Sequence, residues 1–489
     1  MLFSNWEFIF LFLPICFLGY FFLIKQRLFI GSKMWLVTAS LFFYSYWDAS
    51  YLPLILISLA CNYAIGTGLS KSYSHRKRVN RKASLIVGIC FNLGLLGYYK
   101  YSNFLIDNIN LITGSNFELS EIVLPLAISF FTFQQIAYLV DSYRGETSEY
   151  NLLNYTLFVT FFPQLIAGPI VHHREMMTQF ESKWNLLPKT RNILLGVLTF
   201  TIGLGKKVII ADSFAVWADA GFQSASTLNS ALAWATSLSY TFQLYFDFSG
   251  YCDMAIGAAL LFNIKLPINF NSPYKSLDIQ DFWRRWHITL GRFLRDYIYI
   301  PLGGNQKGAI HTYNNLFLTF LIGGIWHGAS WMFVIWGALH GIALVIHRIW
   351  KSLGGNMPKV LAWLVTFNFV NLTWIFFRAS DLNDALSIIK AMLGLNNTIY
   401  DAHAMPTEQL AWLGTNADKI AASYPVYLIT CIPQYLCISI AFYILSCRNS
   451  IELTQSISKK KVILLAIVFT VSIYITVASS SSVFLYFNF

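Results

Sequence analysis

The sequence predicts an all-α, polytopic integral membrane protein, and three observations support this fold class. The chain has 489 residues, of which 56% are hydrophobic, 17% aromatic and only 12% charged. Its mean hydropathy is +0.54. A soluble protein of this length could not bury so much apolar surface. Apolar runs of about 17–25 residues, the length at which a helix crosses a bilayer, recur along the whole chain.

The candidate membrane segments follow one another with no long repeat, flexible linker or low-complexity tract between them. They are residues 6–24, 34–47, 52–69, 83–99, 122–140, 155–171, 193–210, 231–248, 313–328, 331–346, 361–377, 426–445 and 462–478. Because the shortest of them suit re-entrant or interfacial elements, we expect about 11–13 membrane helices. They would form a single transmembrane domain, residues 1–489, and the one extended polar stretch, residues 379–424, is expected on the outer side of the membrane.

The net charge of +11 is explained by membrane topology. The basic segments 71–82 and 459–461 each border a hydrophobic run, so the positive-inside rule places both in the cytoplasm. The same rule places residues 273–311 inside and the N-terminus outside. No small-residue cleavage site follows the first apolar run, which is therefore expected to remain as a helix. The basic residues thus indicate contact with membrane lipid and no nucleic-acid partner.

Several familiar chemistries have no motif in the chain. The sequence contains no GxSxG, no complete P-loop and no HExxH. Its seven cysteines form no CxxC pair and no zinc spacing, so they are expected to be small buried apolar residues. The adjacent His172 and His173 would point to different faces of a helix and make a poor metal site. We expect no metal.

One apolar segment is unsuited to a straight helix. FFPQLIAGPIV, residues 161–171, contains two prolines and a glycine, and charged segments that suit the cytoplasm lie on both sides of it. A re-entrant element that lines a cavity explains both features. A kinked full span is the alternative.

A dense basic and aromatic segment, QDFWRRWHITLGRFLRDYIYIPLGG, occupies residues 280–304. Helical periodicity predicts one amphipathic helix at the membrane surface, with Trp283 and His287 on its apolar face. The spacing i,i+4 predicts the ion pairs Asp281–Arg285 and Arg292–Asp296. His287 is either functional or a contact to lipid headgroups, and the residues alone leave both interpretations open.

A second histidine, His327, lies within the apolar run IGGIWHGASW. An ionisable group inside a membrane is costly and usually functional, so we interpret His327 as a functional residue rather than a helix-packing histidine. Neighbouring glycines, Gly323, Gly324 and Gly328, would let a ligand approach the backbone closely, and Trp326 and Trp331 would wall the site. His340, in WGALHG, is expected to be a packing residue or to support the site indirectly.

These motifs resemble the membrane-bound O-acyltransferases. QDFWRRWHITLGRFLRDYIYIPLGG, IGGIWHGASW and WGALHG, all within the core motif region 270–347, are similar to the bacterial branch. That branch includes alginate and peptidoglycan O-acetyltransferases and the teichoic-acid D-alanyl transfer protein. The opening MLFSNWEFIFLFLP, FFPQLIAGPI, FQLYFDFSGYCDMAIG and the terminal VFLYFNF also look like the alginate-type members, so the resemblance spans nearly the whole chain.

The resemblance implies a reaction and roles for the motif residues. His327 would be the catalytic residue, and His287 would act in or near the path of the acyl donor. An imidazole can serve as general base toward an alcohol, and a thioester donor needs no metal. We therefore expect no bound cofactor; acetyl-CoA, another acyl-CoA or an acyl carrier protein would be the donor substrate. Trp326 and Trp283 are expected to contact substrate. Arg284, Arg285 and Arg295 would face the cytoplasm and receive the donor's phosphates or an acidic carrier protein, although topology alone explains part of this charge.

The C-terminal tail, residues 479–489, is expected to emerge on the extracytoplasmic side and to tuck into the interface or into the protein, because it is rich in aromatic residues. An aromatic membrane anchor is one interpretation. The resemblance implies another, in which Tyr486 carries the acyl group covalently to an extracytoplasmic acyltransferase partner.

The expected function is transfer of a short acyl group from a cytoplasmic thioester toward an extracytoplasmic polysaccharide. Acetyl is the first expectation for this group. Alginate is the first expectation for the acceptor, with peptidoglycan, cellulose or another envelope glycan as alternatives. The expected location is the bacterial inner membrane. A polysaccharide or lipid transporter is the alternative of a different class, but it calls for paired repeats that the sequence does not show. A non-catalytic scaffold would not require His327.

Overall fold

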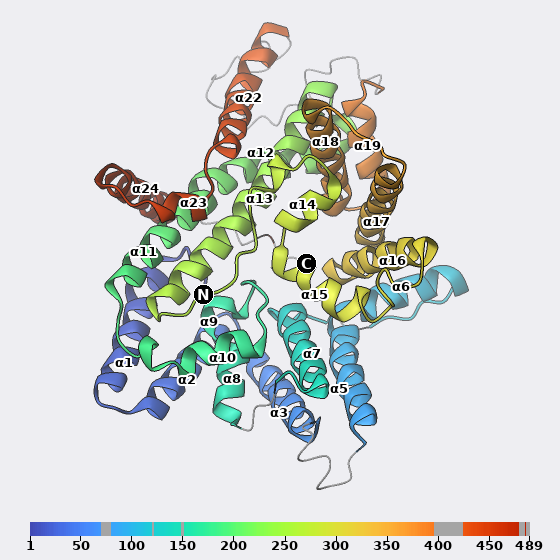
Figure 1. Ribbon diagram of the computed structural model, residues 1–489. Helices are drawn as coiled ribbons and strands as arrows, with labels where there is room; N and C mark the ends of the chain where they lie inside the picture. Colours follow the sequence, from blue (N-terminus) through green and yellow to red (C-terminus); the bar gives the residue numbers. More distant parts are fainter. Residues whose placement is uncertain (70–79, 120–121, 148–150, 396–423, 479–484, 486–489) are drawn as a thin grey trace.

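The structure, a computed structural model, describes residues 1–69, 80–119, 122–147, 151–395, 424–478 and Leu485, with the backbone alone for 424–431 (Figure 1). Throughout these residues the regular secondary structure is helical and no strand occurs. The predicted all-α fold is therefore confirmed.

The N-terminal third begins with a π-helical turn and contains η1 (Phe8–Phe12), α1 (Leu13–Lys25), α2 (Phe29–Ser45), η2 (Ala49–Tyr51), α3 (Leu52–Leu69), α5 (Arg81–Leu96), η3 (Gly97–Tyr101), α6 (Ser102–Thr113) and α7 (Ile128–Arg144). Local capping fixes several ends. The Asn80 side chain accepts from the backbone N–H of Ala83 at the start of α5, and the left-handed Gly114 and Gly145 end α6 and α7.

The middle third contains α8 (Leu152–Thr160), α9 (Phe162–Leu165), α10 (His173–Glu181), η4 (Lys183–Asn185), α11 (Thr190–Gly205), η5 (Lys206–Ala211), α12 (Asp212–Gln223), η6 (Ala225–Thr227), α13 (Ser230–Leu261), η7 (Pro273–Lys275), α14 (Ile279–Arg285), α15 (Ile288–Leu294) and η8 (Arg295–Tyr299). Helix α13 crosses the centre of the molecule and packs against α11 and α12 (Figure 1). A Cβ on Gly203 of α11 would lie 2.5 Å from the carbonyl oxygen of Gly250, so glycine allows α11 and α13 to touch through their backbones.

The C-terminal third contains α16 (Ala309–His327), α17 (Trp331–Ser352), α18 (Lys359–Arg378), α19 (Leu382–Met392), α22 (Tyr424–Ser446), α23 (Ser450–Gln455) and α24 (Lys459–Ala478). Helix α24 lies at the edge of the molecule (Figure 1), and none of its apolar side chains is fully buried. Such exposure is expected of a helix that faces lipid.

Among the described residues, seven helical stretches are long and apolar enough to cross a membrane: Phe8–Lys25, Ala49–Leu69, Arg81–Thr113, Thr190–Gln223, Trp331–Ser352, Lys359–Arg378 and Lys459–Ala478. These confirm a multi-pass membrane protein. Two of them are 33 and 34 residues long, well beyond the predicted segments 83–99 and 193–210, because the π-helical turns η3 and η5 continue the helix.

Other predicted segments are shorter, longer or broken. Helix α7 starts later than residue 122 because Pro125 and the left-handed Ala127 precede it. Helix α13 extends to Leu261, well past residue 248. Segment 155–171 does not form one helix: Phe161 is non-helical and Pro163 follows, so α8 and α9 are separate and too short to span a bilayer. A re-entrant element fits this geometry.

The predicted helix over 280–304 is wrong. It breaks at Trp286 and His287 into α14, α15 and the π-helical η8, because His287 has a left-handed φ of 44°. The Asp281–Arg285 pair is present at 3.0 Å, whereas Arg292 pairs with Glu175 at 2.7 Å and Asp296 pairs with Arg295. His287 is therefore buried at a break between two short helices and does not lie on the apolar face of one continuous surface helix.

Tyr486, the predicted acyl carrier, lies outside the described residues, as do most of the tail 479–489 and much of the polar stretch 379–424. Leu485 is described, and its side chain is buried at 8% exposure. The extracytoplasmic placement of the tail stays a prediction.

Candidate functional site

His327 is the last residue of α16, where that helix meets α17. The two helices touch closely because Gly324 faces Gly337: a Cβ on Gly324 would lie 2.4 Å from the carbonyl oxygen of Phe333 and 2.8 Å from Gly337 Cα. The sequence prediction that Gly324 leaves room for a ligand is therefore wrong, since the backbone of α17 fills that space. The glycine instead fixes the end of α16, and with it the position of His327.

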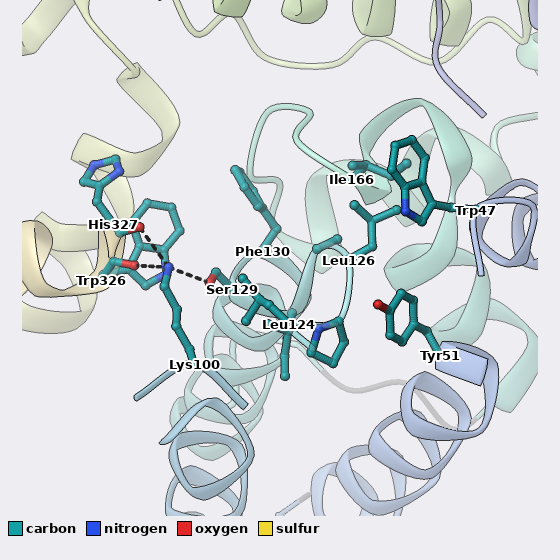
Figure 2. Close-up of a pocket in the computed structure, with 13 residues that line it drawn as sticks. Trp47, Tyr51, Lys100, Leu124, Leu126, Ser129, Phe130, Ile166, Trp326 and His327 are labelled. Atoms are coloured by element: carbon teal, nitrogen blue, oxygen red, sulfur yellow. Dashed lines mark hydrogen bonds between the residues drawn. The ribbon is translucent and has the colours of Figure 1, made fainter. Parts of the chain in front are cut away.

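Two side chains from η3 hold the C-terminal end of α16 in place. Lys100 Nζ donates to the carbonyl oxygens of Trp326 and His327 at 2.8 and 2.9 Å, and contacts Ser129 Oγ at 3.3 Å (Figure 2). Tyr101 donates its hydroxyl to the carbonyl oxygen of Ile325 at 2.6 Å. The last carbonyls of a helix have no partner within it, and the N–H groups of Lys100 supply one to each of these two carbonyls.

Aromatic rings surround the imidazole of His327, which is buried. The ring centroids of Trp326, Trp336 and Phe377 lie 4.9, 5.0 and 5.2 Å from it. Trp331, predicted to wall the site, instead lies 56% exposed and donates to Asn108 Oδ1. The indole N–H groups of Trp326 and Trp336 are buried and have no hydrogen-bond partner among the described residues, so these donors beside His327 are available to a ligand.

A cavity of about 90 Å³ lies beside this histidine (Figure 2). Lys100, Trp326 and His327 line one side, Trp47 and Tyr51 lie across from them, and residues 124–130 form the wall between. A second cavity, of about 280 Å³, shares Lys100 and Leu124 with the first and reaches the start of α17. Lys100 therefore stands between two spaces that both adjoin the end of α16.

His287 is buried at the break between α14 and α15, with Phe248 4.8 Å away. Asn269 holds this turn: its carbonyl oxygen accepts from Ile288 and its side chain accepts from the backbone and hydroxyl of Thr289. Within the described part of the chain, neither ring nitrogen of His287 has a hydrogen-bond partner. Because burial penalises the imidazolium, the pKa of His287 falls to about 3, which keeps the ring neutral at physiological pH.

Both ring nitrogens of His340 have hydrogen-bond partners. Trp283 Nε1 donates to His340 Nδ1 at 3.2 Å, and the hydroxyl of Thr373, which donates to Val370, lies 3.0 Å from His340 Nε2. Nε2 must then carry the proton and donate to Thr373. His340 therefore joins α14, α17 and α18, and Trp283, predicted to contact substrate, is its partner. His327 and His340 both pack against the ring of Trp336, whose centroid lies 5.0 and 4.9 Å from theirs.

The arginines of the basic segment divide into two groups. Arg284 and Arg295 are exposed, and Arg295 pairs with its neighbour Asp296. Arg285 is half-buried and paired with Asp281. The charge open to a ligand on this surface is therefore smaller than the sequence suggests. Among the described residues, no group of three or more histidine, cysteine or acidic side chains is arranged to hold a metal ion.

Sequence reasoning missed three residues of the site: Lys100, Trp336 and Phe377. Trp336 and Phe377 are aromatic residues in helices full of them and carry no distinguishing signal. Lys100 does carry one, because it is a lone cation in YYKY within the long apolar stretch Arg81–Thr113. A charge in such a position marks a functional or structural partner.

The fold and site define a class: a polytopic helical membrane protein whose deeply buried histidine adjoins a cavity at the end of a fixed helix. The model of the membrane-bound O-acyltransferase family matches residues 38–380. The chain belongs to this family and is an O-acyltransferase.

Three relatives illustrate the range of the family. The peptidoglycan O-acetyltransferase of Helicobacter pylori is 49% identical, with 100% of this chain and 98% of the relative covered. The probable alginate O-acetylase AlgI of Pseudomonas aeruginosa is 43% identical over 80% of this chain and 75% of its own. The teichoic acid D-alanyltransferase of Bacillus subtilis is 28% identical over 52% of this chain and 68% of its own.

We expect Lys100→Met to lower acyl transfer at least ~10-fold, because the two hydrogen bonds from Lys100 Nζ to the end of α16 are lost. The methionine keeps the length and apolar stem of lysine. Acyl groups on the cell-surface glycan, measured at equal protein level, check the result. Lys100→Arg should restore part of the activity, since a guanidinium can donate to both carbonyls. Equal loss in both variants would contradict a role of Lys100 in positioning His327.

Proposed function

We propose that this protein transfers acetyl groups to peptidoglycan on the outer side of the bacterial inner membrane. The observation that carries the proposal is His327, a buried imidazole fixed at the end of α16 beside a cavity. The similarity to the peptidoglycan O-acetyltransferase of Helicobacter pylori over the whole chain supports this acceptor, which the sequence alone offers as an alternative to alginate. Alginate, the first expectation from sequence, becomes the second candidate, because the similarity to AlgI covers 80% of the chain.

The proposed chemistry is acyl transfer from a thioester to an oxygen nucleophile. An uncharged imidazole at His327 accepts the proton of the attacking hydroxyl, the new C–O bond forms, and the C–S bond of the thioester breaks. The thiolate that leaves takes up the proton, so the products are an ester and a thiol. The aromatic rings around His327 exclude water, which would otherwise hydrolyse the thioester.

The donor is proposed to be acetyl-CoA or an acyl carrier protein that approaches from the cytoplasm. Exposed Arg284 and Arg295 are candidates to contact its phosphates or acidic residues. Neutral His287, whose two ring nitrogens have no partner in the described ranges, would border the donor's path toward His327. On the outer side, Tyr486 would receive the acetyl group and pass it to a separate extracytoplasmic acyltransferase, which would modify the glycan.

The acceptor can be tested by comparing cells with and without the protein. We expect ester-linked acetyl on purified peptidoglycan to fall to background when the protein is absent, and to return when it is supplied. Mass spectrometry of muropeptides provides the measurement, and acetyl on secreted polysaccharide from the same cells is the comparison. Loss of acetyl from secreted uronic-acid polymer, with peptidoglycan unchanged, would favour the alginate alternative and overturn the peptidoglycan assignment.

A further inference from the structure

Asp247 lies on α13 at the centre of the molecule, and its side chain is only 1% exposed. Lys207 of η5 places its Nζ 2.9 Å from Asp247 Oδ1 and 2.8 Å from Asp212 Oδ1. The other carboxylate oxygen of Asp247 accepts a hydrogen bond, at 2.9 Å, from the backbone N–H of Leu485. A residue near the C-terminus is thereby joined to the central helix.

This arrangement is costly, because a carboxylate and an ammonium lose their hydration when they are buried. An ion pair alone would leave Asp247 Oδ2 without a donor, and Leu485 supplies it. Because the donor is a main-chain N–H, the bond fixes the path of the chain at position 485 whatever the side chain there. The buried leucine side chain adds apolar contact at the same place.

A second ion pair also joins η5 to α13, but its aspartate contacts a different segment of the chain. Lys206, the neighbour of Lys207, contacts Asp253 Oδ2 at 2.6 Å, and Ser450 donates its hydroxyl to Asp253 Oδ1 at 3.0 Å. Asp253 thus accepts a hydrogen bond from the start of α23, whereas Asp247 accepts one from Leu485. The two aspartates have the same chemistry and hold different segments.

We propose that Asp247, neutralised by Lys207, is the anchor that positions the C-terminal segment within the helix bundle. The role of this anchor in acyl transfer rests on the proposed function: Leu485 immediately precedes Tyr486, so fixing its backbone limits where the proposed acyl carrier can reach. Asp247 is accordingly a positioning residue and not a catalytic one.

The anchor is tested with a Leu485→Cys variant on a background without the native cysteines. Its thiol should react slowly with a membrane-impermeant maleimide, because position 485 is buried and retains its N–H. Adding Asp247→Asn removes the charge that accepts this N–H, and the labelling rate should rise on the order of 10- to 100-fold, the range for loss of a hydrogen bond to a charged group. Asp253→Asn is the matched control and should leave the rate unchanged.

Leu485→Pro and Leu485→Ala form a second pair that leaves both ion pairs in place. Proline removes the donor N–H and alanine keeps it, so glycan acylation should fall at least ~10-fold more in Leu485→Pro. Equal labelling in the Asp247→Asn and Asp253→Asn backgrounds would overturn the anchor. Unequal labelling with equal activity of the two Leu485 variants would support the anchor and overturn its role in acyl transfer. The labelling readout requires no acyl transfer, so it stands even if Tyr486 proves not to carry the acyl group.

Discussion

Replacing His327 with alanine is expected to abolish acyl transfer while the protein still inserts and accumulates. The imidazole is the buried group beside the cavity that is proposed to take the proton of the attacking hydroxyl. Loss of a general base typically slows such a reaction by ~10²–10⁴-fold. Ester-linked acetyl on the glycan, normalised to the amount of protein in the membrane, measures the effect.

His311 provides a matched control on the same helix. It lies in the first turn of α16 and is exposed, so His311→Ala should keep normal acylation. His327→Gln, which retains a polar side chain but no basic nitrogen, should be as inactive as His327→Ala. His287→Ala is expected to lower activity as well. Near-normal acylation by a well-accumulated His327→Ala protein would make His327 structural and would remove the proposed mechanism.

The membrane helices could be predicted because their signal is local and long. A long apolar run predicts a membrane helix directly from its own residues. Segments 52–69, 331–346 and 361–377 all fall within observed helices. The errors lie where a contact from elsewhere decides the backbone. The turn at His287 depends on Asn269, which lies far outside the window that periodicity reads.

The site could be predicted only in part, for the same physical reason. His327 is unusual in its own segment, so the cost of burying an ionisable group was enough to identify it. Its immediate surroundings come from other helices: Lys100 from η3, Trp336 from α17 and Phe377 from α18. Contacts of this kind are determined by how the helices pack. A single sequence does not reveal which side chains from distant segments will be in contact. Trp331 is nearer to His327 in sequence than Trp336 is, but it lies exposed at the start of α17, whereas Trp336 packs against the imidazole.

The second large effect is expected from Tyr486→Phe, a change that deletes one oxygen. The ring and its preference for apolar surroundings remain, while the proposed attachment point for the acyl group is lost. In the relay, the phenolic oxygen attacks the thioester carbonyl, the thiol leaves, and the tyrosyl ester then passes its acetyl to a hydroxyl group on the partner. A phenol, with a pKa near 10, leaves more readily than an alkyl alcohol, which suits onward transfer. Glycan acylation should therefore be lost as fully as in His327→Ala.

Tyr474→Phe is the control for this substitution, because Tyr474 belongs to α24 and is 73% exposed. It should acylate normally. A direct readout comes from the C-terminal peptide, which should carry a hydroxylamine-sensitive acetyl ester in the wild-type protein and none in Tyr486→Phe. The ester should also be missing from His327→Ala, because the phenol loses its proton acceptor. If Tyr486→Phe acylates like wild type, the tyrosine is an aromatic anchor and the hydroxyl that His327 activates must belong to another molecule. If the ester persists in His327→Ala, the relay survives but its general base must be sought elsewhere, with neutral His287 as the next residue to replace.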